Sequence, residues 1–127
     1  MPLQIKLFPD ANAISRAAAM MGADAIRSAI ARDGSATVVL ATGASQVAML
    51  ATLINAEGID WTKVTAFHLD EYIGIPETHP ASLRHYLYDH FVHRIAQPVS
   101  FVPIDGMAKV DDEIKRVGYV GCSGGIG

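Results

Sequence analysis

The sequence has little cysteine and no long apolar run. Cys122 is the only cysteine among 127 residues, which excludes an internal disulfide. No apolar run approaches the ~18–20 residues that cross a bilayer. The N-terminus also lacks the basic stretch and long apolar core of a signal peptide. These absences predict a cytoplasmic protein that does not enter the membrane.

Positive charge is not in excess either. Lys and Arg total 10 against 13 Asp and Glu, which gives a net charge of −3. Because nucleic-acid surfaces rely on a strong positive field, no nucleic-acid partner is expected, and a small ligand or a protein partner is favoured.

Apolar residues are plentiful. They make up 50% of the chain and the mean hydropathy is +0.25, so the chain can bury a sizeable core. Domains usually contain ~100–200 residues, so the length fits one domain or part of one.

Strand and helix patterns alternate along the chain. Alternation of apolar and polar residues predicts an edge strand over residues 3–8, and a β-branched apolar run predicts a central strand over 36–41, covered by helices on both sides. This order predicts an α/β fold with a mostly parallel sheet and helices on both faces. Further strands are predicted at 64–69, 99–103 and 117–121, and helices at 11–31, 47–57, 80–94 and 109–116.

In such sheets, ligands bind beyond the carboxyl ends of the strands. The first loop to examine there is Thr42-Gly43-Ala44-Ser45, between a predicted strand and a predicted helix. Small residues and backbone N–H groups at this point suit an anion such as phosphate, although Ser45 could instead only cap the helix. Neither the Walker pattern nor the dinucleotide glycine spacing is present, so no nucleotide cofactor is expected.

Two adjacent carboxylates, Asp70 and Glu71, follow the next predicted strand. Because a strand alternates its faces, the two side chains should point in different directions and have different roles. One carboxylate facing a cleft could act as a general base on a carbon acid beside a carbonyl, while the alternative is that both are solvated or hydrogen-bonded within the loop.

Histidines gather in and just before the predicted helix at 80–94, but they predict no metal site. His79, His85, His90 and His93 lie near Asp89 without any pair at tight metal-site spacing. A solvated or interface face of the helix explains them more directly.

Residues 67–76, Phe-His-Leu-Asp-Glu-Tyr-Ile-Gly-Ile-Pro, followed by His79-Pro80-Ala81-Ser82, resemble the signature of the glucosamine-6-phosphate deaminase/isomerase family. Residues 41–45 resemble the phosphate loop of that family, and residues 124–127 resemble the glycine turn before its Asp-Gly-His segment. The resemblance covers nearly the whole chain. It implies a Rossmann-like fold in which residues 1–127 form the N-terminal portion of a single, incomplete domain.

The family opens the ring of an amino-sugar 6-phosphate, moves a proton between C2 and C1, and releases ammonia to give a ketose 6-phosphate. The resemblance therefore implies a phosphorylated amino sugar, glucosamine or galactosamine 6-phosphate, as ligand, and no metal or organic cofactor. A homo-oligomer is left open as an alternative to a monomer. By motif position Asp70 matches the base that abstracts the C2 proton. Thr42, Gly43, Ala44 and Ser45 match phosphate contacts, and Glu71 and Gly125 are assigned to the substrate site.

The sequence also departs from the family pattern. The ring-opening histidine of the family and its acidic partners follow the glycine turn at which this sequence stops, so we expect the 127 residues alone to be inactive or nearly so. Two alternatives stay open. A 6-phosphogluconolactonase would usually carry Arg at Tyr72, and a non-catalytic sugar-phosphate sensor would not need Asp70.

Overall fold

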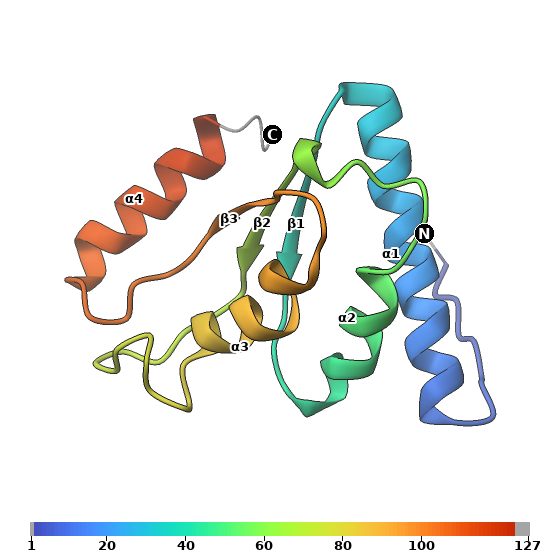
Figure 1. Cartoon of the computed structure of the whole chain (residues 1–127), viewed down its shortest axis with the longest axis horizontal. Helices are drawn as coiled ribbons and strands as arrows, with labels where there is room; N and C mark the ends of the chain where they lie inside the picture. Colours follow the sequence, from blue (N-terminus) through green and yellow to red (C-terminus); the bar gives the residue numbers. More distant parts are fainter. Residues whose placement is uncertain (1, 124–127) are drawn as a thin grey trace.

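The computed structural model describes residues 2–123, which form a layered α/β arrangement (Figure 1). The main elements are α1 (Ala11–Asp33), β1 (Ala36–Leu40), α2 (Val47–Leu53), β2 (Val64–His68), α3 (Leu83–His90), β3 (Ser100–Val102) and α4 (Val110–Ser123). Short 3-10 turns lie at η1 (Ala44–Gln46), η2 (Trp61–Lys63) and η3 (Val92–Arg94). Among these described residues, no helix is both long and apolar enough to cross a membrane.

The strands described by the structure form one parallel sheet in the order β1-β2-β3. This confirms the α/β class with a parallel sheet. The prediction that residues 36–41 form a central strand is wrong within the described part of the chain, because β1 is an edge strand and β2 lies in the middle. Val39 on this strand is also 62% exposed, so the strand is not covered by helices on both sides as predicted.

Helix α1 begins and ends with local signals that the sequence contains. The Asp10 carboxylate accepts a hydrogen bond from the Ala13 N–H at 2.8 Å. Gly34 ends the helix at a φ of 80°, and its N–H donates to the Ile30 carbonyl. Between these ends, buried Ala19 and Ala23 allow the helix to pack closely against its neighbours.

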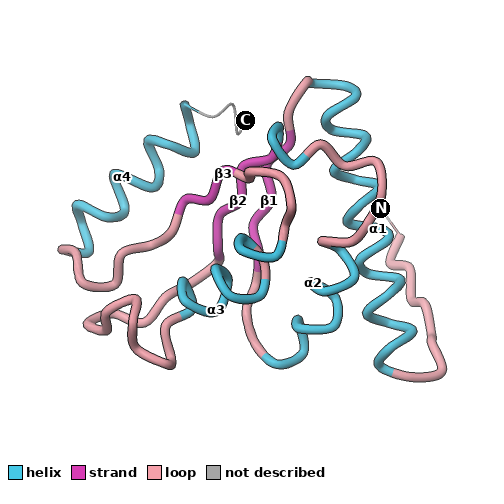
Figure 2. The backbone as a smooth tube through the Cα atoms, viewed as in Figure 1, coloured by secondary structure: helices cyan, strands magenta, loops and turns pink. Residues whose placement is uncertain are grey.

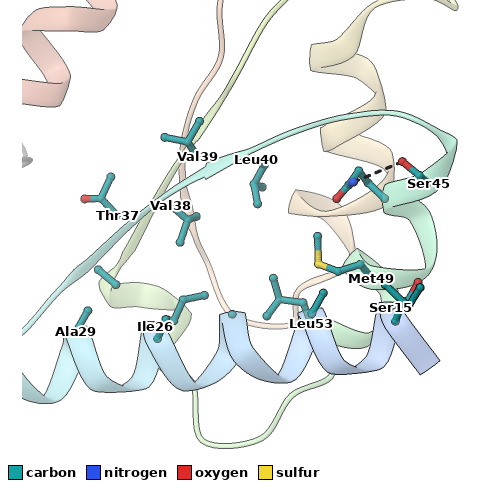
Figure 3. Close-up of a pocket in the computed structure, with 16 residues that line it drawn as sticks. Ser15, Ile26, Ala29, Thr37, Val38, Val39, Leu40, Ser45, Met49 and Leu53 are labelled. Atoms are coloured by element: carbon teal, nitrogen blue, oxygen red, sulfur yellow. Dashed lines mark hydrogen bonds between the residues drawn. The ribbon is translucent and has the colours of Figure 1, made fainter. Parts of the chain in front are cut away.

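The hydrophobic core joins α1, α2 and α3 to one face of the sheet. Leu50, Leu87 and Phe91 are fully buried in it, together with Val64 and Ala66 of the central strand. The opposite face carries Thr37 and Val39, which point away from α1 (Figure 3). Helix α4 lies on the other side of the strands from α1 (Figure 1).

Two predicted strands are absent from the structure. Residues 2–8 are exposed and form no strand, because an isolated extended segment gains backbone hydrogen bonds only from a neighbouring strand. Residues 117–121 lie within α4, so the predicted helix at 109–116 continues to Ser123. Helical hydrogen bonds are local and satisfy this backbone without a strand partner.

Candidate functional site

The two candidate loops leave the same edge of the sheet. Leu40 of β1 stands opposite His68 of β2, and the Leu69 N–H donates to the Leu40 carbonyl at 3.0 Å. Thr42 and Asp70 each follow this register pair by two residues. Since neighbouring strands lie ~4.8 Å apart, the loops start side by side. Figure 2 shows both leaving the carboxyl ends of β1 and β2, with α3 beside them.

The first loop, residues 42–45, turns at Gly43. Its φ of 131° lies in a region that side chains disfavour, so glycine is required for this turn. The Gly43 carbonyl accepts two hydrogen bonds, one from the Gln46 N–H at 3.0 Å and one from the Tyr86 hydroxyl at 2.7 Å. The Ser45 hydroxyl makes no cap bond to η1 or α2 and accepts from the Gln46 side-chain amide at 3.5 Å (Figure 3). The helix-cap alternative for Ser45 is therefore not observed.

The second loop, residues 70–76, places its two carboxylates in different surroundings, although both lie beyond the end of β2, where strand alternation no longer applies. Asp70 is exposed beyond the end of β2. The Glu71 side chain is only 1% exposed. It accepts five hydrogen bonds at 2.8–3.0 Å, whose donors are the N–H groups of Tyr72, Leu83 and Arg84, the Ser82 hydroxyl and the Arg84 Nε–H.

These donors keep Glu71 ionised. Burial alone would raise the pKa of its carboxyl group, but the hydrogen bonds from Leu83, Arg84, Ser82 and Tyr72 lower it to about 2. Because both oxygens already accept hydrogen bonds inside the protein, the geometry favours a positioning role for Glu71. The predicted contact between Glu71 and substrate stays a prediction.

Arg84 completes the attachment of the second loop. Beyond its bonds to Glu71, it donates to the Asp105 carboxylate and to the Ile75 carbonyl, each at 3.1 Å. The Gly74 N–H also donates to the Gly106 carbonyl at 2.7 Å. The loop that carries Asp70 is thus tied to the start of α3 and to residues 104–108.

Sequence reasoning missed Arg84, although one signal could have found it. Arg84, Leu87 and Phe91 have helical spacing, and all three are buried. A charged residue in a buried helical stripe requires a buried partner of opposite charge, and Glu71 was the nearest carboxylate at the candidate site.

His68 makes a second attachment that the sequence did not reveal. Its buried Nε2 accepts the Ile104 N–H at 2.7 Å, and its Nδ1 is buried with no hydrogen-bond partner among the described residues. Burial, the largest influence, lowers the pKa of the imidazole despite the nearby carboxylates of Glu71 and Asp70. A neutral imidazole therefore links the end of β2 to the loop after β3.

A groove of about 460 Å³ between α1 and β1 reaches the first loop (Figure 3). Ser45, Gln46 and Met49 line one end of it, and Ile26, Val38 and Leu40 line its apolar floor. This lining does not suit a charged sugar, so the groove is not the candidate site.

The structure brings together the first loop and Asp70 from the predicted site residues, while Gly125 lies outside the described residues. Among the described residues, no group of three or more His, Cys, Asp or Glu side chains is placed to hold a metal ion.

The fold and these loops define the chain as an α/β protein of parallel-sheet type, with its candidate site at the carboxyl ends of neighbouring strands. Residues 9–118 match the family of glucosamine-6-phosphate isomerases and 6-phosphogluconolactonases. The chain belongs to this family.

Individual relatives agree with the family. A glucosamine-6-phosphate deaminase of Pseudarthrobacter chlorophenolicus is 35% identical over 97 residues, which are 74% of this chain and 38% of that protein. Glucosamine-6-phosphate deaminase 2 of Giardia intestinalis is 32% identical over 107 residues, 80% of this chain and 41% of that protein. The chain therefore spans well under half the length of these curated relatives.

Solved structures share the fold. A monomeric glucosamine-6-phosphate deaminase superposes with a TM-score of 0.82 at 25% identity, over 95% of this chain and 51% of that one. A 6-phosphogluconolactonase from Shewanella baltica superposes with a TM-score of 0.79 at 20% identity, over 87% of this chain and 48% of that one. The second likeness concerns the fold alone.

Proposed function

We propose that the chain carries part of the active site of an amino-sugar phosphate isomerase/deaminase, as the N-terminal portion of a single domain. The substrate would be glucosamine 6-phosphate or galactosamine 6-phosphate, which is converted to a ketose 6-phosphate with release of ammonia. One observation carries the proposal: Asp70 and residues 42–45 leave the same sheet edge, each two residues beyond the paired Leu40 and His68.

In this proposal the two loops have different roles. Residues 42–45 bind the phosphate and so fix the position of the sugar, and Asp70 moves the proton between C2 and C1. Asp70 is exposed at the end of β2, where a substrate can reach it, whereas buried Glu71 holds the loop behind it. Gly125 is proposed as a further substrate contact.

Three further statements belong to the proposal. The reaction needs no metal or organic cofactor. The 127 residues alone turn over little or no substrate, because the family's ring-opening histidine follows the segment that resembles its glycine turn. A cytoplasmic location and self-association also remain predictions.

Replacement of Asp70 by Asn tests the assignment of the base. In the natural protein carrying this sequence, we expect Asp70→Asn to lower ammonia release from glucosamine 6-phosphate by about 100-fold or more, because general-base catalysis is usually worth ~10²–10⁴-fold. The dissociation constant for the sugar phosphate should stay within about threefold, since the phosphate loop is unchanged.

Asp89→Asn is the matched control, because Asp89 is an exposed aspartate on α3. It should leave both turnover and binding unchanged. Turnover by Asp70→Asn above a tenth of the wild-type rate would contradict the assignment, and hydrolysis of a 6-phosphosugar lactone without ammonia release would instead indicate the lactonase branch.

A further inference from the structure

Helix α3 contacts both candidate loops. Its first turn holds the Asp70 loop, because the N–H groups of Leu83 and Arg84 donate to the Glu71 carboxylate at 2.8 and 3.0 Å. One turn further along, the Tyr86 hydroxyl donates to the Gly43 carbonyl at 2.7 Å. Figure 1 shows α3 beside the carboxyl ends of β1 and β2, where the two loops leave the sheet.

The contact between Tyr86 and Gly43 fixes the orientation of a peptide group. The Gly43 carbonyl accepts from both the Tyr86 hydroxyl and the Gln46 N–H, so its two lone pairs are engaged. In a trans peptide the C=O and the following N–H point in opposite directions. With the Gly43 carbonyl turned toward α3, the Ala44 N–H is turned away from α3.

Because residue 43 is glycine, its conformation depends on the hydrogen bond from Tyr86. With a φ of 131°, it occupies a backbone region that glycine enters readily but that no side chain stabilises. A glycine peptide can also rotate into other conformations at little cost, so the conformation seen here depends on contacts from outside the loop. Tyr86 supplies such a contact from a different element, 43 residues away along the chain.

We propose that Tyr86 is a positioning residue for the phosphate loop: its hydroxyl holds the Gly43 peptide so that the Ala44 N–H is presented to the phosphate of the ligand. This rests on the proposed function for the identity of the ligand. Because α3 also holds Glu71, the same helix sets the phosphate loop relative to the loop of Asp70. Burial raises the pKa of the Tyr86 hydroxyl, which keeps it a donor at neutral pH.

Tyr86→Phe removes the hydroxyl and keeps the ring. Tyr88→Phe is the matched control, since Tyr88 lies in the same helix but its ring packs against Phe101, 5.1 Å between centroids. The test measures dissociation constants of the 127-residue chain for inorganic phosphate, glucosamine 6-phosphate and glucosamine by NMR titration. Amide hydrogen exchange of residues 43–46 is measured without ligand.

We expect Tyr86→Phe to weaken binding of phosphate and glucosamine 6-phosphate by about 3- to 10-fold, the range that one hydrogen bond supplies. Binding of glucosamine, which lacks the phosphate, should not change between the variants. Exchange at residues 43–46 should accelerate in Tyr86→Phe and stay unchanged in Tyr88→Phe. A purely structural tyrosine would lower the unfolding midpoint without this local effect.

Equal binding and equal exchange in the two variants would overturn the role of Tyr86. If the wild-type chain binds neither phosphate nor glucosamine 6-phosphate, the proposed function fails instead, and the exchange data, which need no ligand, still decide whether Tyr86 holds the loop. Should Tyr86→Phe not fold, a slowly exchanging Tyr86 hydroxyl proton with a nuclear Overhauser effect to Gly43 in the wild type would support the contact, and its absence would contradict it.

Discussion

Glu71 shows how a single side chain can hold a loop in place. Its carboxylate is buried and charged, with five hydrogen bonds and a close ion pair to Arg84. Buried ion pairs contribute little net stability compared with apolar packing, but the loss of one partner leaves an unpaired charge. The main contribution of Glu71 is therefore to fix the position of the loop that carries Asp70.

Glu71→Gln should lower the free energy of unfolding at pH 7 by about 3 kcal/mol, because buried Arg84 would lose its buried carboxylate partner and keep only Asp105, whose side chain is half exposed. Urea unfolding measures this change. Glu77→Gln, at an exposed position nearby in the sequence, is the control and should stay within about 0.5 kcal/mol of wild type. Equal stability of the two variants would contradict the geometry at Glu71.

The same carboxylate makes stability depend on acid. Its pKa is about 2 in the folded chain and ~4.3 in an unfolded one, so its contribution is complete above about pH 4.5 and is lost as the pH falls toward 2. Unfolding measured between pH 5 and pH 2.5 should show this loss in wild type. In Glu71→Gln the free energy of unfolding should depend less steeply on pH over this range. An identical dependence on pH in both proteins would contradict the assignment.

His68 should be neutral through most of the physiological range. Burial lowers its pKa below the unfolded value of ~6.5, so the unfolded chain takes up a proton more readily and stability falls as the pH drops below 6.5. NMR of the imidazole nitrogens at pH 7 should find the proton on Nδ1, because Nε2 accepts from Ile104. A proton on Nε2, or a pKa above 6.5, would contradict this.

The sequence predicted that the side chains of Asp70 and Glu71 point in different directions and have different roles. One of the two carboxylates is exposed and the other is buried, but strand alternation is not the cause, because β2 ends at His68 and both residues lie in the loop after it. The partner of the buried one could not be predicted in the same way. Arg84 lies 13 residues further along, and the pairing depends on how α3 folds back onto the loop.

At the scale of elements, the close packing of residues 104–108 against the Asp70 loop depends on Gly106. A Cβ atom added there would overlap the Tyr72 carbonyl oxygen and approach the Ile75 carbonyl at 3.4 Å. Backbone cannot move away as a flexible side chain can, so the two loops would have to separate. The glycine is thus required by the approach of residues 104–108 to the Asp70 loop.

Gly106→Ala should therefore lower the free energy of unfolding by about 1–3 kcal/mol. Gly118→Ala is the control and should instead raise the free energy of unfolding, by up to ~1 kcal/mol. Gly118 lies in α4 with open space around it, and alanine favours helix over glycine. Thermal unfolding of both variants measures the difference. A Gly106→Ala protein as stable as wild type would contradict the contact with Tyr72.

Helices with strong local signals were predictable and the outer strands were not. Asp10 and Gly34 define the ends of α1 by hydrogen bonds within a few residues. Residues 3–8 and 117–121 have strand-like patterns, but a strand also needs a neighbour. In the described structure the first segment has no such neighbour and the second forms helix.

At the scale of the whole molecule, the parallel sheet determines where chemistry can occur. One crossover connection, through α2, places the ends of β1 and β2 at one edge, which is why residues 28 positions apart in the sequence, Thr42 and Asp70, start neighbouring loops. The alternating pattern of elements was enough to predict this edge. The contacts of α3 with both loops were not predictable, since they depend on side chains distant in the sequence.

The central claim is that residues 42–45 and Asp70 form parts of one sugar-phosphate site. Titration of the ¹⁵N-labelled chain with glucosamine 6-phosphate, followed by amide chemical shifts, tests it most directly. We predict saturable shifts in both residues 42–46 and residues 69–72 with a single dissociation constant, and competition by inorganic phosphate. The absence of saturable shifts in these two segments would contradict the account.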